Sequence, residues 1–318
     1  MKLKRLLPFL CYLLVISACT NAETKENLCK PDCMFVNLID KNLNNRDFAN
    51  TNFIEANLRN STLYQANFSN SRLDGANLAS ADLRRTNMSN AVFRGANMRG
   101  ANLGGANLTN TDFSSANLDN ANLSNATITD ADLSSVSFIN ADLSGLDLTG
   151  SKLESSNMQG ANLNAANLSK MELRATSFSN GNLKGVIMEN SYVRGSWLNL
   201  SDLSGANLHG AVLNGSVMIG ANLSGANLSE AQLRGVDLTG CKLNGANLRG
   251  TDLRGSNISK QPDTFNLGDA EFDPILKELR PAVLASLNVH CDLRGAIYDS
   301  LTQWPLNFVI PPGVIFVK

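Results

Sequence analysis

Few residues in this chain are suited to catalysis. Of the two histidines, His209 and His290, neither has the neighbours that a zinc site or a serine–histidine–aspartate set requires. No Gly-Lys-Ser/Thr loop that could hold a phosphate is present. We therefore expect no enzyme activity, no metal and no cofactor.

Cysteine chemistry is more plausible. Cys29 and Cys33 are close enough to close a small disulfide loop in an oxidising compartment, and no further metal ligands lie near them. Cys241 and Cys291 are instead predicted to be small, buried, unreactive thiols.

The element that positions all these residues has a period of five. Every fifth residue from Leu38 to Ile258 is apolar, mostly leucine, with a small residue two places before it and Asn or Asp just before it. A period of five fits neither a helix nor a strand, so the chain must turn a corner every five residues. Four corners give a coil of 20 residues, and the array predicts about 11 coils.

Runs such as Ala76-Asn77-Leu78 and Ser204-Gly205-Ala206-Asn207-Leu208 resemble the A(D/N)LXX signature of the pentapeptide repeat family. The resemblance covers more than two thirds of the chain and implies a right-handed quadrilateral parallel β-helix, an all-β fold. Residues 20 apart should then stack, with Phe93 beside Phe113 and Phe48 beside Phe68 in the interior.

The 20-residue register also predicts two outward surfaces. An arginine column could bind phosphate or carboxylate groups of lipopolysaccharide, peptidoglycan or an acidic protein, although solvated charge is the alternative. Its members are Arg174, Arg194, Arg234 and Arg254. A second surface is an exposed apolar patch in positions that normally hold Asn or Asp, with locally relaxed repeats as the alternative. Its members are Tyr192, Trp197, Val212 and Val217, possibly extended by Ile187 and Ile219.

The N-terminus has the pattern of a secretory signal, a basic start followed by an apolar run too short to span a bilayer. Ile16-Ser17-Ala18-Cys19 resembles a bacterial lipobox, which implies lipidation of Cys19 and a membrane anchor. Cleavage near Ala22 and a free periplasmic or secreted protein is the alternative. By the same resemblance, Thr20 favours the outer membrane.

Four segments are predicted: a signal peptide (1–18), a tether and N-terminal cap (19–35), the solenoid (36–260) and a helix-containing cap (261–318). The cap helix should begin at Asp273-Pro274, where apolar residues recur at helical spacing. Beyond it, Cys291, Leu293 and Ala296 return to the five-residue register.

These features favour a non-enzymatic, envelope-tethered scaffold that presents its surface to an unknown protein or envelope polymer. The alternative is a DNA-mimic inhibitor of gyrase or topoisomerase, as the family resemblance suggests. The export signal and the net charge of only −1 disfavour it, and no nucleic-acid binding is expected.

Overall fold

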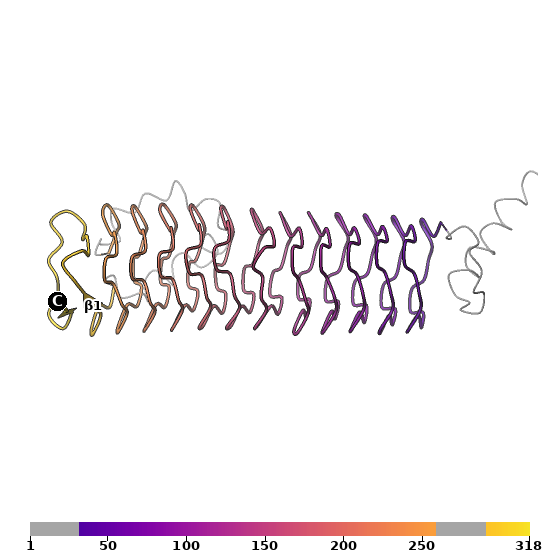
Figure 1. Ribbon diagram of the computed structural model, residues 1–318, viewed down its shortest axis with the longest axis horizontal. Coiled ribbons are helices and arrows are strands. Elements are labelled where there is room, and N and C mark those ends of the chain that lie inside the picture. The colour runs from indigo at the N-terminus through magenta and orange to yellow at the C-terminus, as the bar shows by residue number, and fades with distance from the viewer. Residues whose placement is uncertain (1–31, 259–290) are drawn as a thin grey trace, which may run out of the picture. The chain divides into compact units, whose positions relative to one another are not determined.

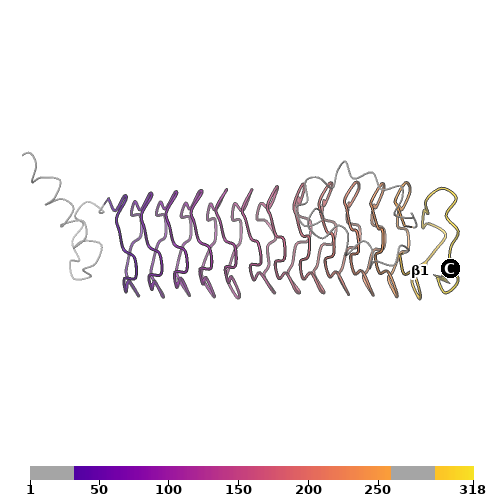
Figure 2. The same ribbon diagram turned by 180° about the vertical axis from the view of Figure 1, so that it is seen from behind.

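The computed structural model describes residues 32–258 and 291–318, which form parts of two compact units. Unit 1 ends at Asp142 and unit 2 begins at Leu143. In each unit, successive turns of the chain lie side by side (Figure 1 and, from behind, Figure 2). The described residues contain no helix. The predicted helix at Asp273-Pro274 lies outside them.

A parallel backbone ladder joins each coil to the next. In unit 1, Asn57 pairs with Asn77 and Asn77 with Asn97, and in unit 2 Asn207 pairs with Asn227. Leu58 N donates to Asn77 O at 2.7 Å, and Asn77 N donates to Ala56 O at 2.9 Å. This confirms the predicted stacking of residues 20 apart, the arrangement of a parallel β-helix.

The corners explain the residues at the end of each repeat. Ser61 N donates to Leu58 O at 3.1 Å and closes a turn whose last corner residue, Asn60, has a φ of 57°. This left-handed conformation costs least for glycine and is tolerated by asparagine. Glycine therefore takes the same corner elsewhere, as at Gly100.

The interior consists of the leucine column and the small residues beside it. Leu58 and Leu78 are fully buried, and Phe93 stacks on Phe113 with ring centroids 5.1 Å apart. Phe48 and Phe68 stack at 5.2 Å, as predicted. Serines in the small interior position are satisfied by backbone: Ser61 Oγ, for example, donates to Leu58 O at 2.6 Å.

The outward asparagines stabilise both the turn and the stack. Asn77 Oδ1 accepts from Ala79 N at 3.2 Å, and Asn97 Nδ2 of the next coil donates to the same oxygen at 3.3 Å. An Asn or Asp side chain thus caps the corner that follows it. This is the physical reason for Asn or Asp before each leucine.

Unit 2 changes register near its C-terminal end. Lys242 pairs with Asp292 and Asn247 with Ile297, so partners lie 50 residues apart instead of 20, which means that 30 residues are inserted. The ladder therefore continues past the predicted boundary at residue 260. Strand β1 (Ile297–Tyr298) then pairs in parallel with β2 (Ile315–Phe316), close to the C-terminus (Figure 1).

Candidate functional site

One coil of unit 2 departs from the asparagine rule at three outward positions in succession. These positions hold Ile187, Tyr192 and Trp197, and the next coil holds Val212 and Val217 beside the last two. We call these five residues the apolar belt. None of their side chains has an oxygen that could cap the following corner as Asn77 does. The belt therefore lacks a stabilising contact that the regular repeats have.

The ladder brings the belt residues together as the register predicted. Tyr192 pairs with Val212, and Trp197 with Val217. The Tyr192 residue is 41% exposed, Ile187 is also exposed, and Trp197 and Val217 are partly exposed.

Two residues differ from the expected exposed patch. Val212 is only 6% exposed, and it lies in the ladder between Tyr192 and Gln232, which are both larger. Ile219 is 1% exposed, and its backbone N–H donates to Asn199 Oδ1 at 3.1 Å. The accessible surface of the belt thus comprises Ile187, Tyr192, Trp197 and Val217.

The predicted arginine column is largely neutralised within unit 2. Arg174 Nε donates to Glu172 Oε2 at 3.0 Å. Arg234 and Arg254 both bond to Asp252, the second at 2.8 Å. Carboxylates two residues before an arginine, or on the next coil, are within its reach. The expectation of a continuous anion-binding column is corrected accordingly.

The electrostatics of Asp252 follow from these contacts. Hydrogen bonds from Arg254 lower the pKa of its carboxyl, and Arg234 lowers it further against the opposing effect of burial. Asp252 Oδ1 also accepts from Arg254 N at 3.2 Å, so the side chain caps its own corner.

Arg194 is the column member without an ion pair among the described residues. It is exposed, and in sequence it lies between the belt residues Tyr192 and Trp197. Beside it in the column, Asn214 Oδ1 accepts from Arg234 N at 2.9 Å. One unpaired cation therefore accompanies the apolar belt.

The cysteines require one correction. Cys241 and Cys291 are not free thiols but form a disulfide with a Cα–Cα distance of 4.6 Å. The insertion brings residue 291 to the place where residue 261 would stand in an uninterrupted array. Both cysteines occupy the small position two residues before an apolar one, and this shared position was the available signal.

The other cysteine predictions are not tested. Cys19 and Cys29 lie outside the described residues, so both the lipidation and the Cys29–Cys33 pairing stay predictions. Cys33 is fully buried and disulfide-bonded.

No arrangement suited to catalysis occurs in residues 32–258 and 291–318. Nowhere in this part of the chain do three His, Cys, Asp or Glu side chains converge on a possible metal site. His209 Nδ1 lies 2.9 Å from Ser229 Oγ of the next coil, a contact that joins coils. His290 lies outside the described residues.

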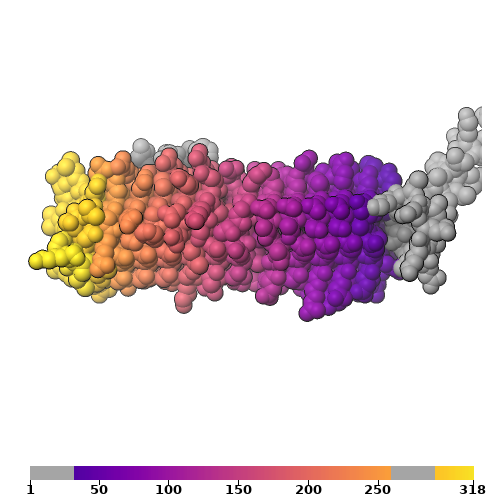
Figure 3. Space-filling model, viewed as in Figure 1, coloured from indigo at the N-terminus to yellow at the C-terminus, as the bar shows by residue number. Residues whose placement is uncertain are grey.

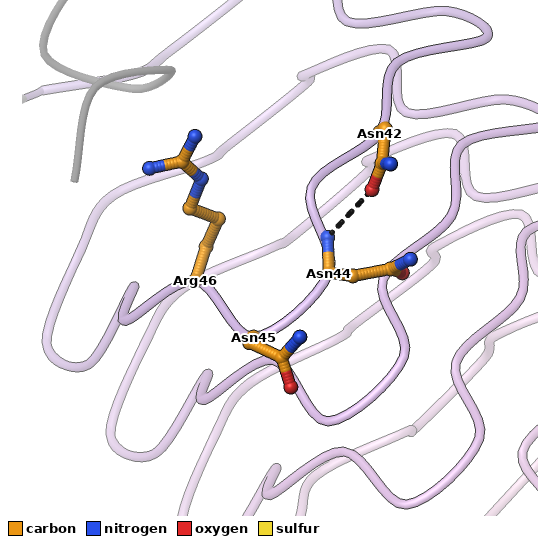
Figure 4. A pocket seen from close by; sticks show the side chains of 4 residues that line it. All are labelled: Asn42, Asn44, Asn45 and Arg46. Atoms are coloured by element: carbon orange, nitrogen blue, oxygen red, sulfur yellow. Dashed lines mark hydrogen bonds between the residues drawn. The ribbon is translucent and has the colours of Figure 1, made fainter.

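A shallow depression lies on unit 1 (Figure 4). Asn42 Oδ1 accepts from Asn44 N at 3.2 Å, and the Arg46 side chain extends away from Asn45. Asn44 Oδ1 accepts from Tyr64 N at 2.8 Å. These amides serve the backbone and do not converge on a ligand.

A second depression, on unit 2, is lined by side chains of mixed charge. They include Lys152, Glu154, Lys170 and Glu172. On the face drawn in Figure 3, side chains cover the coils of each unit without a deep hollow. The candidate site is therefore a surface and not a cavity.

Comparison with known proteins agrees with this architecture. The family model described as pentapeptide repeats matches eight copies, at residues 32–70, 76–114, 116–154, 156–195, 201–240 and 231–260. A search of the curated proteins found no match.

Solved structures of similar chains come from several sources. HetL, a pentapeptide repeat protein involved in heterocyst differentiation regulation in the cyanobacterium Nostoc, is 28% identical, with a TM-score of 0.38, and the match covers 71% of this chain and 88% of that one. A pentapeptide repeat protein from the Arabidopsis thaliana thylakoid lumen is 34% identical, with a TM-score of 0.31, over 31% of this chain and 69% of that one. QnrB1, a plasmid-mediated fluoroquinolone resistance protein, is 20% identical, with a TM-score of 0.31, over 62% and 87%.

Proposed function

Because the chain belongs to the pentapeptide-repeat family, we propose that it is a non-enzymatic scaffold of the bacterial cell envelope that binds another protein through the apolar belt. The membership also supports a right-handed, four-sided winding of about 11 coils. We include in the proposal a helical cap within residues 261–318. A crystal structure would check the winding and the cap.

The observation that carries the binding proposal is the loss of corner caps in one coil. Ile187, Tyr192 and Trp197 replace side chains that elsewhere bond to the next backbone N–H. Violations of a local structural rule concentrate at functional sites. Exposed aromatic residues next to an arginine, here Arg194, are also typical of residues that dominate binding energy at protein interfaces.

The envelope proposal rests on the N-terminal signal pattern and on the disulfide. A disulfide such as Cys241–Cys291 persists in oxidising compartments and is rare in the cytosol. The described residues include no helix with the length and apolar character needed to cross a bilayer. We propose that a lipid on Cys19 supplies the anchor, with the outer membrane as its location.

The binding proposal is tested by replacing Tyr192 and Trp197 with asparagine in the full chain. Asparagine restores the residue of the regular repeats, so we expect an unchanged melting temperature and a loss of the proteins crosslinked in the native envelope. Tyr64→Asn, a partly exposed tyrosine of unit 1, is the matched control. Recovery of the same partners by the double variant and the wild type would refute the role of the belt.

The anchor is tested separately with Cys19→Ala. The wild type should incorporate a labelled fatty acid and sediment with outer membranes, whereas the variant should carry no label and move to the soluble fraction. A wild-type protein found unacylated in the cytosol would overturn the envelope proposal and return attention to gyrase binding.

A further inference from the structure

The C-terminal end of unit 2 exposes a second apolar surface, separate from the belt. Leu306 is 90% exposed and Val309 is 84% exposed. Leu301, Ile315 and Phe316 are exposed as well. We call these five residues the terminal face. An exposed apolar cluster of this kind marks an interaction site in a soluble protein.

The terminal face stands on an ordered base. Tyr298 contacts Trp304 and Phe316 edge to face, with ring centroids 5.6 and 5.3 Å apart. Trp304 stacks on Phe308 at 5.1 Å. Asp299 Oδ1 accepts from Gly250 N at 2.9 Å and ties this segment to the preceding coil. The exposed side chains are therefore held in place before any partner binds.

The face is also without charge. From Ser300 to Val317 the chain has no Asp, Glu, Lys, Arg or His. Sheet edges that must stay unpaired usually carry charged residues, above all lysine, or proline within the strand. Here β2 carries neither of them, so nothing in it opposes pairing with another strand.

The backbone at β2 determines which partner fits. Ile315 N donates to Ala296 O and Val317 N to Tyr298 O, both at 2.8 Å. Because successive amides of a strand point to opposite sides, the N–H and C=O of Phe316 point away from β1. The described residues supply no hydrogen-bond partner for either group. A lipid tail could not supply one.

We propose that the terminal face binds the terminal face of a second copy of this chain, with the two β2 strands antiparallel about a two-fold axis at Phe316. In such a pair, one residue of each strand exchanges both of its N–H···O=C bonds with its counterpart. A two-fold interface uses the same patch on both subunits, and an uncharged apolar face is complementary to itself. No charge is buried when Leu306 and Val309 meet the second copy.

The first test measures the mass of the full chain by sedimentation in detergent. We expect the mass of two chains for the wild type and of one chain for Leu306→Asp/Val309→Asp. These side chains lie mostly in solvent, so the melting temperature should not change. Phe35→Asp places the same charge at an exposed phenylalanine of unit 1 and should leave two chains. A single-chain wild type, or a double variant that keeps the two-chain mass, would overturn the proposal.

A second test examines the strand pairing itself. Phe316→Pro removes the outward N–H but none of the bonds to β1, whereas Phe316→Leu keeps the whole backbone. The proline variant should have the mass of one chain and the leucine variant the mass of two. Equal masses for the two variants would rule out pairing through β2. Neither result depends on the belt, so this proposal and the proposed function can fail independently.

Discussion

Asp252 and Asp237 show how similar residues in unit 2 differ in their surroundings. Both cap a corner, Asp252 by accepting from Arg254 N and Asp237 by accepting from Thr239 N at 3.0 Å. Only Asp252 also bonds to two arginine side chains, which lower the pKa of its carboxyl. The charge of Asp252 therefore contributes to stability beyond its role in the turn.

We predict that Asp252→Asn lowers the free energy of unfolding at pH 7 by about 1 kcal/mol, because both arginines are half exposed and their ion pairs are weak. The lowered pKa means that the contribution is present above the unfolded-state pKa of about 4. It is lost as the pH falls through the folded-state pKa.

Denaturant unfolding of wild type and variant from pH 7 down to pH 3 would measure this difference, which should shrink below about pH 4. Asp237→Asn is the matched control, since it keeps the corner cap and removes no arginine contact. A difference that does not change with pH would contradict the assigned cause.

At the scale of the element, Cys241–Cys291 joins the two parts of the ladder that flank the insertion. The bond closes a segment of 50 residues, and the backbone pair Lys242–Asp292 lies next to it. Closing a long segment stabilises mainly by restricting the unfolded chain. The disulfide should therefore hold the last coil on unit 2.

We predict that Cys241→Ala/Cys291→Ala lowers the free energy of unfolding of unit 2 by about 2–4 kcal/mol. The terminal coil should then unfold before the remaining coils, and tryptophan fluorescence from Trp304 would report it. Cys241→Ala alone should have a similar effect, because either change removes the same bond. Superimposable unfolding curves for wild type and double variant would show that the bond adds no stability.

At the scale of the molecule, the disulfide and the signal pattern point to the same compartment. We predict that the exported chain has Cys241 and Cys291 fully oxidised, whereas a chain lacking residues 1–18 and kept in the cytosol has both reduced. Alkylation under denaturing conditions followed by mass spectrometry would count the free thiols in each sample. Free thiols at both positions in the exported chain would argue against an oxidising location.

The sequence by itself determined the repeat, the stacking register and the identity of the interior. A leucine every fifth residue and corner residues that tolerate a positive φ, such as Asn60 and Gly100, admit few other folds. Contacts 20 residues apart, such as Phe93 with Phe113, followed directly.

Only the tertiary structure decided the features that depend on a break in that register or on side-chain reach. The insertion places Cys291 on Cys241, a contact 50 residues apart that no constant period predicts. The pairing of Arg234 with Asp252 depends on the length of the arginine side chain, and the burial of Val212 depends on larger neighbours. A period specifies which residues are neighbours, whereas charge pairing and exposure depend on how far each side chain extends.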